Sequence, residues 1–209
     1  RMLKVLSERG LVQKSASAPR RKKARVFDKH AQPWIFKDYR TIVIGERVQI
    51  DHMTVEKNGS EMKEFHAWER KSKHLTVGIF DAATAENAKK FLMDFQRNAP
   101  FKILSIQVDG GSEFRAAFEK ACQELKIPLI ALPPARPKYN GGVKRFNRTL
   151  REEFWSKNFA SVSIKDMNDE LQKYVEKYNN FRPHNSLHGM TPMEYINSTC
   201  GRHNQSHMS

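Results

Sequence analysis

Two aspartates give the sequence its strongest chemical signal, because each closes a short apolar segment with the alternation of a β-strand. Asp51 ends the segment 47–51, and Asp109 ends the segment 104–109. A single aspartate in such a place is most often a cap or a turn residue, and Asp109, which precedes two glycines and Ser112, fits an Asx turn into a helix. Two aspartates that end two core strands of one chain favour a shared site.

Two neighbouring carboxylates repel each other unless a cation lies between them. Oxygen ligands favour Mg²⁺ or Mn²⁺ over zinc. Two such ions about 3.5–4 Å apart would clamp the attacking and leaving oxygens of a phosphoryl transfer. A two-metal site needs a third carboxylate, and the place for it is the start of a helix near residue 144. That residue is a lysine.

The stretch from Ala135 to Trp155 is predicted to be a loop followed by a helix. Asn140-Gly141-Gly142 has the composition of a turn that begins the helix. Apolar residues then recur at helical spacing, at positions 143, 146, 150 and 154, and predict a buried stripe. Lys144, Arg148 and Arg151 fall on an adjacent face, which either follows a phosphate backbone or is simply solvated.

The remaining segments predict an α/β fold. After an apolar run at 42–44, three successive strand patterns at 47–51, 64–68 and 75–80, with an Asn58-Gly59 hairpin turn, indicate an antiparallel meander. Helix and strand patterns then alternate, with helices at 85–95 and 112–125, strands at 104–109 and 128–132, the 135–155 unit and a last helix at 167–178. Because parallel strands need crossover connections, we expect a five-stranded mixed sheet with helices on both faces.

The charge of the chain indicates a polyanionic partner. The net charge is +14, and residues 1–29 hold ten Lys/Arg against Glu8 and Asp28, which gives +8. A solubilising arm is the alternative, but the basic cluster at 20–25 favours contact with a nucleic-acid backbone. No apolar run approaches membrane-spanning length and no signal-peptide pattern opens the chain, so we expect no membrane partner. Cys122 and Cys200 lack metal-ligand spacing, which is typical of a reduced, intracellular protein.

Three regions are expected along the chain. Residues 1–33 are a basic linker that begins with the remnant of an upstream helical DNA-binding domain, since the chain opens on Arg1 and has a helix-like segment that stops at Gly10. Residues 34–197 form the core. Residues 198–209 are a polar tail that we expect to fray.

Four segments together resemble the integrase core of bacterial insertion-sequence transposases, which are relatives of the retroviral integrases: QIDHMTV, IQVDGGSEF, PPARPKYNGGVKRFNRTLREEFW and YNNFRPHNSLHGMTPMEYI. The resemblance implies an RNase H-like fold and a DDE polynucleotidyl transferase that uses two Mg²⁺ or Mn²⁺ ions. Such an enzyme cuts transposon ends by hydrolysis and joins the 3′-hydroxyl to target DNA. It also implies double-stranded DNA as partner, a homo-oligomer that holds two DNA ends, and a bacterial, cytoplasmic, nucleoid-associated location.

Carried over residue by residue, the resemblance makes Asp51 the first catalytic and metal-binding carboxylate and Asp109 the second. The third is a glutamate in a pattern like N-G-x-x-E-R, and Lys144 stands there, with 34 residues between it and Asp109. Glu152 lies about 12 Å further along the helix and Glu113 lies beside Asp109, so neither is expected to replace it. An ammonium group cannot bind Mg²⁺ and is expected to pair with Asp51 or Asp109.

Three explanations of Lys144 stay open: a substitution that disables catalysis, a naturally decayed or repurposed transposase, and a rearranged site that uses another carboxylate. The resulting hypothesis is a transposase core that binds DNA but does not cut or join it. The alternatives are an inactive integrase-core module with a DNA-binding or regulatory role and, more distantly, an RNase H-like nuclease acting on RNA hybrids. The residues expected to contact DNA are Lys22, Arg25, Lys138, Tyr139, Asn140, Arg148 and Arg151.

Overall fold

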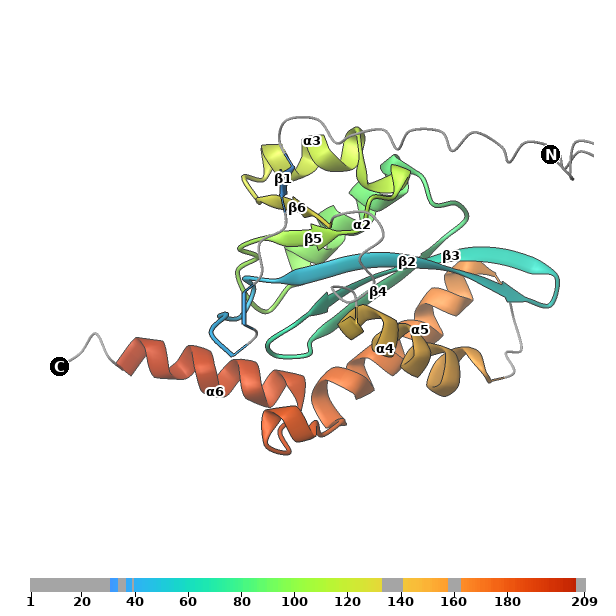
Figure 1. Ribbon diagram of the computed structural model, residues 1–209. Coiled ribbons are helices and arrows are strands. Elements are labelled where there is room, and N and C mark those ends of the chain that lie inside the picture. Colours follow the sequence, from blue (N-terminus) through green and yellow to red (C-terminus); the bar gives the residue numbers. More distant parts are fainter. Residues whose placement is uncertain (1–30, 34–36, 39, 133–140, 158–162, 206–209) are drawn as a thin grey trace, which may run out of the picture.

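A mixed β-sheet organises the computed structural model, which describes residues 31–33, 37–38, 40–132, 141–157 and 163–205. The strands are β1 (Gln32–Pro33), β2 (Val48–Lys57), β3 (Ser60–Glu69), β4 (Leu75–Phe80), β5 (Ile106–Val108) and β6 (Leu129–Ala131). Their order is β1-β6-β5-β2-β3-β4 (Figure 1), with β2, β3 and β4 antiparallel and β2, β5, β6 and β1 parallel. The predicted five-stranded mixed sheet is confirmed, and the two-residue β1 adds a sixth strand at its edge.

The turn between β2 and β3 follows directly from the sequence. Asn58 and Gly59 both have positive φ, at 49° and 77°, and they join the paired residues Lys57 and Ser60. This is the conformation that a two-residue hairpin loop requires and that Asn-Gly adopts readily. The predicted hairpin is therefore confirmed, although both of its strands are longer than their apolar alternation indicated.

Helices cover both faces of the sheet (Figure 1). Helices α2 (Ala85–Asn98) and α3 (Ala117–Glu124) pack on one face. Helix α4 (Gly141–Leu150), the π-helical turn η3 (Arg151–Trp155) and α5 (Ile164–Phe181) pack on the other. Thr84 caps α2 by accepting a hydrogen bond from the Asn87 N–H, and Ser163 caps α5 in the same way from Asp166.

The alternation of β2 separates two hydrophobic cores. Val48 and Ile50 belong to the core beneath α2 and α3, whereas Met53 and Val55 belong to the core beneath α4 and α5. Successive residues of a strand point to opposite faces, so Gln49 and Asp51 share the face that α4 covers. This alternation places the side chain of Asp51 on the α4 side of the sheet.

Helix α5 binds the edge strand β4 through side-chain amides. Asn179 pairs with the N–H and C=O of Leu75, at 3.0 and 2.8 Å, and Asn168 does the same with Ile79, at 2.8 and 2.9 Å. Gln172 donates to the carbonyl of Val77 at 3.0 Å. Five backbone groups of the edge strand are therefore bound by side chains of a helix.

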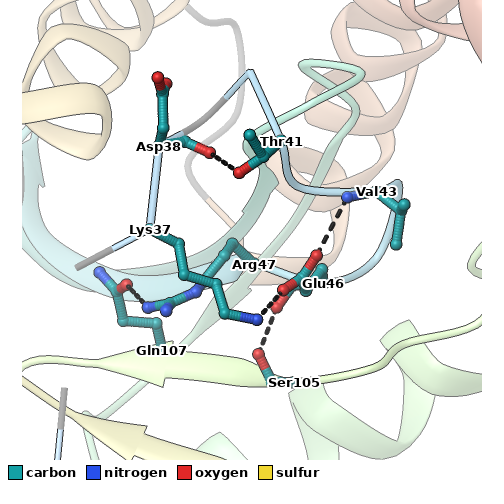
Figure 2. Close-up of polar contacts among 8 residues, drawn as sticks. All are labelled: Lys37, Asp38, Thr41, Val43, Glu46, Arg47, Ser105 and Gln107. Atoms are coloured by element: carbon teal, nitrogen blue, oxygen red, sulfur yellow. Dashed lines mark hydrogen bonds and ion pairs between the residues drawn. The ribbon is translucent and has the colours of Figure 1, made fainter. Parts of the chain in front are cut away.

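The segment before β2 ends in a turn, and the apolar run at 42–44 does not form a strand. Figure 2 shows the reason: Glu46 accepts hydrogen bonds from Lys37 and from the Val43 N–H, and its own carbonyl accepts from Ser105. Gly45, with φ of 82°, accepts from Leu104 N–H at 2.9 Å and Ser105 N–H at 3.3 Å. These contacts hold the start of β2 against the start of β5.

The C-terminal region differs from its expectation. Helix α6 runs from Pro192 to Gln205 (Figure 1), so residues 198–205 of the stretch that was predicted to fray continue a helix instead, while residues 206–209 lie outside the described residues. The predicted linker lies outside the described residues except for 31–33. Within the described ranges, no helix combines the length and apolar character needed to cross a bilayer.

Candidate active site

Asp51 and Asp109 are brought together by the parallel pairing of β2 and β5. Val48 pairs with Ile106 and Gln49 with Gln107, so the same register, continued by two residues, places Asp51 beside Asp109. Asp109 immediately follows β5, as predicted. Asp51 was predicted to end its strand as well, but β2 continues to Lys57 because the hairpin with β3 extends it.

The carboxylate of Asp109 is half-buried and sits in a field of negative charge. Burial raises its pKa above the ordinary value, and the nearby carboxylates of Asp51 and Glu113 raise it further. The Gly111 N–H, which donates to Oδ1 at 2.9 Å, and His52 act in the opposite direction. Asp109 thus forms the Asx turn that its sequence predicts while also facing Asp51. The two roles are compatible, because the turn uses one of its oxygens.

A third carboxylate, Glu113, belongs to the same cluster. It lies in the 3₁₀ turn η1 (Ser112–Phe114), and its Oε1 is 3.0 Å from Nδ1 of His52. This contact is the main cause of the raised pKa of His52. Burial acts against it, and the charges of Asp51 and Asp109 raise the pKa a little further. Burial opposes ionisation of Glu113, but His52 and hydrogen bonds from its own backbone N–H and from Ser112 together outweigh burial, so the pKa of Glu113 is lowered. Glu113 is therefore engaged with His52, on the opposite side of β2 from α4.

The start of α4 packs closely on the face of β2 that carries Asp51. A Cβ on Gly142 would lie 2.5 Å from the Trp68 ring and 3.3 Å from the Gln49 side chain, two residues from Asp51. Only glycine allows this approach. Lys144 follows two residues later in the first turn of α4; its side chain lies outside the described atoms, so the predicted pairing with an aspartate stays a prediction.

The donor set fits one divalent cation better than two. Asp51 and Asp109 are oxygen ligands on neighbouring strands, which suits Mg²⁺ or Mn²⁺. Among the described residues, however, no group of three His, Cys, Asp or Glu side chains is arranged to hold a metal ion together. The site has the two aspartates that a metal needs and lacks the acidic residue at the start of α4.

The predicted DNA-contacting residues divide into two groups. Arg148 and Arg151 are exposed at the end of α4 and the start of η3. Arg148 pairs with Glu152 at 2.7 Å, which raises the pKa of its guanidinium. Lys22, Arg25, Lys138, Tyr139 and Asn140 lie outside the described residues.

Sequence reasoning missed a pocket on the α4 side of the sheet. It is a hollow of about 500 Å³ whose described lining includes four cations, Arg70, Lys73, Arg145 and Arg182, and no carboxylate. We call it the basic pocket. Arg145 shares a helical stripe with Gly142 and Thr149 (i, i+3, i+7), a spacing that could have revealed its side of the helix. The other three cations come from distant parts of the chain, which no local pattern connects.

Comparison with solved structures places this architecture among retroviral integrase cores. The chain resembles the catalytic core domain of BIV integrase with a TM-score of 0.60 at 20% identity, over 76% of this chain and 99% of that one. A chain of the simian T-cell lymphotropic virus intasome, solved with PP2A regulatory subunit B56 gamma, has a TM-score of 0.64 at 17% identity. This match covers 73% of the present chain and 54% of that one. The HTLV-2 integrase catalytic core domain, solved in complex with magnesium, has a TM-score of 0.53 at 16% identity. This match covers 73% of the present chain and 96% of that one. These likenesses define the class of fold, an RNase H-like integrase core.

Sequence comparison finds a similarity to integrase cores. Residues 125–192 match the family described as the integrase core domain. A protein described as an integrase, ORF3 of Spiroplasma virus SpV1-C74, is 29% identical over 139 residues, covering 57% of this chain and 38% of that protein. An uncharacterized 39.2 kDa protein of insertion element IS476 from Xanthomonas euvesicatoria is 27% identical over 92 residues. This match covers 44% of the present chain and 26% of that protein. The predicted resemblance to the integrase-core transposases of insertion sequences is confirmed, and the chain spans less than half the length of these two relatives.

Proposed function

We propose that this chain is the core of a DDE transposase that acts on double-stranded DNA and that Lys144 prevents its two-metal cleavage and strand-transfer reaction. The observation that supports the proposal best is the register of β2 and β5, which sets Asp51 beside Asp109 on the sheet face that α4 approaches. A two-metal site would take its third carboxylate from the first turn of α4. This chain places a lysine there.

The two aspartates and Lys144 would have opposing roles in this site. Asp51 and Asp109 would hold one divalent cation, which, when bound, polarises a phosphodiester and activates water. Burial, and to a smaller extent the neighbouring Asp51 and Glu113, raises the pKa of Asp109, so a bound cation would favour the charged form of this carboxylate. An ammonium group at position 144 supplies charge but no ligand, so it would compete with a cation for the two aspartates.

The DNA partner is supported by the charge of the chain and by its exposed basic side chains. The net charge of +14 favours association with phosphates. Arg148 and Arg151 on the α4–η3 helix, together with Lys22, Arg25, Lys138, Tyr139 and Asn140, would contact the backbone or approach the strand to be cut. We also propose a homo-oligomer, because a transposase must hold two DNA ends at once.

The test is to restore the missing carboxylate. The Lys144→Glu variant is expected to join labelled DNA ends to a target in the presence of Mg²⁺ or Mn²⁺, whereas the chain with Lys144 is not. Lys144→Gln is the matched control, because it removes the charge without adding a ligand and should stay inactive. Adding Asp51→Asn to Lys144→Glu should abolish the gained activity. Equal joining by the original chain and the Lys144→Glu variant would refute the proposal.

The alternative is an inactive integrase-core module that binds DNA in a regulatory role, and Lys144 is the observation that favours it. It predicts that both the original chain and Lys144→Glu bind DNA and that neither joins it. Cleavage of an RNA–DNA hybrid would instead support the more distant nuclease.

A further inference from the structure

The basic pocket lies between α4, the end of α5 and the turn from β3 to β4. Gly142 and Arg145 line it from α4, Tyr178 and Arg182 from the C-terminal end of α5, and Arg70 and Lys73 from the turn. Its volume of about 500 Å³ is in the range of ligand-binding cavities. It is thus a built hollow rather than a flat basic surface.

The cations around the pocket are held in place but only partly neutralised. Nζ of Lys73 donates to the Arg70 carbonyl at 2.6 Å and lies 4.9 Å from the centre of the Trp68 ring. Arg182 lies over Tyr178, at 5.4 Å, and pairs with Glu153. No described carboxylate forms an ion pair with Arg70, Lys73 or Arg145.

Neighbouring groups respond to this concentration of positive charge. Burial lowers the pKa of Lys73, and Arg70, Arg145 and Lys71 lower it further, although Glu69 acts against them. Glu69 is already engaged, because it accepts hydrogen bonds from Ser72 and from the Gly45 N–H. Burial lowers the pKa of His184 to about 4, with Arg182 and Lys73 as further causes, so this imidazole is neutral and adds no charge of its own. The pocket therefore lacks an anion, and its chemistry suits a phosphate group.

The pocket also has a fixed position relative to the paired aspartates. In the β2–β3 register Trp68 lies opposite Gln49 and His66 lies opposite Asp51. Two residues along a strand span about 7 Å, so Trp68, in the wall of the pocket, lies about that far along the sheet from the position of Asp51. A DNA strand with one phosphate at Asp51 and Asp109 would therefore run with its neighbouring phosphates beside the pocket.

We propose that the basic pocket binds a backbone phosphate of the DNA strand that passes the Asp51–Asp109 site, with Arg145, Arg70 and Lys73 as its ligands. The inference rests on the proposed DNA-binding function and adds a second contact region to it. Helical spacing sets Arg145 about a sixth of a turn from Arg148 and about a third of a turn from Arg151. The pocket therefore adjoins the exposed Arg148–Arg151 face and would extend the path of the strand from α4 toward the turn between β3 and β4.

The experiment compares two variants that each remove one exposed cation. Arg145→Gln removes a pocket cation, and Lys120→Gln removes one from α3 on the opposite face of the sheet. Binding of a fluorescein-labelled duplex with a single-stranded 3′ end is followed by anisotropy across a series of salt concentrations. Arg145→Gln should weaken binding about tenfold and reduce the salt slope by about one. Lys120→Gln should leave both unchanged. Equal changes in DNA affinity and salt slope in the two variants would overturn the proposal that the basic pocket binds a phosphate.

A second measurement locates the phosphate. Neutral methylphosphonate groups are placed singly along the 3′ end of the labelled strand. One position should weaken binding to the original chain and have no further effect on Arg145→Gln. If every position affects both proteins alike, Arg145 does not contact a particular phosphate and the proposal is wrong.

Two further outcomes separate this proposal from the function on which it rests. If the original chain binds DNA and Arg145→Gln binds it equally well, the pocket fails and the DNA-binding function stands. If the original chain binds no DNA, both fail. Stabilisation of the original chain, but not of Arg145→Gln, by deoxyadenosine monophosphate, with DNA affinity the same in both, would show a site for free nucleotides and overturn the assignment to a DNA strand.

Discussion

Gly45 offers a direct test of how the two aspartate-bearing strands are aligned. A Cβ at this position would lie 2.0 Å from the carbonyl oxygen of Lys102 and 3.1 Å from its carbon, and the residue has φ of 82°. Gly59 has a similar φ, of 77°, but a Cβ there would meet nothing within 4 Å. The two glycines therefore differ in available space while sharing the same backbone strain.

The expected cost of each alanine follows from this difference. The left-handed conformation costs a non-glycine residue about 1–2 kcal/mol, so Gly59→Ala should lose about that much. Gly45→Ala should lose the same amount and, in addition, about 1–3 kcal/mol for forcing atoms into a filled space. The neighbour cannot give way easily, because it is backbone that leads into β5.

Thermal and urea unfolding followed by circular dichroism would measure the difference. Each kcal/mol corresponds to about 2–4 °C in Tm for a chain of this size, so Gly45→Ala should melt several degrees below Gly59→Ala. It should also weaken the alignment of β2 with β5, since Gly45 accepts hydrogen bonds from Leu104 and Ser105. Equal loss of stability in the two variants would refute the view that this contact constrains the strands.

Two further predictions concern buried or half-buried charges. Removing the His52–Glu113 pair with Glu113→Gln should destabilise the fold most between about pH 4.5 and 6.5, where both groups are charged in the folded and unfolded chain. The raised pKa of His52 means that its contribution fades as pH rises through the folded value, and the lowered pKa of Glu113 means that its contribution fades as pH falls through the folded value. A constant difference from pH 4 to 9 in urea titrations would contradict this assignment. Separately, Trp155→Phe removes the indole N–H that donates to the fully buried Glu64, and it should cost about 1–3 kcal/mol in the free energy of unfolding; Trp155→Phe with Glu64→Gln should lose less than the two single variants added together.

The sequence predicted the elements of the fold well where apolar periodicity and turn residues agree. The order of strands and helices, the Asn58-Gly59 turn and the approach of Asp51 to Asp109 all follow from local patterns combined with the geometry of parallel strands. The turn at His184 is likewise local: its carbonyl accepts from the Leu187 and Gly189 N–H groups, and its own N–H donates to the Met190 carbonyl.

The misses arise where contacts distant in sequence override local pattern. Ile42 to Ile44 has strand composition, but the hydrogen bonds of Glu46 and the close approach of Gly45 to Lys102 hold it in a turn. Glu113 was set aside as misplaced, and its pairing with His52 depends on how η1 packs on β2. The basic pocket joins residues from 70 to 182, so only the assembled fold could show it.

The amide contacts between α5 and β4 have a mechanical consequence. In hydrogen-bonding terms α5 replaces the next strand of the sheet, because five backbone groups of β4 at residues 75, 77 and 79 are bound by its side chains. A shift of α5 by one residue along β4 would oppose these amides to inward-facing groups and break all five bonds. The position of the helix along the sheet is thus fixed by these bonds. Arg182, which follows directly after α5, therefore keeps a fixed position relative to Arg70 and Lys73 in the turn that precedes the same strand.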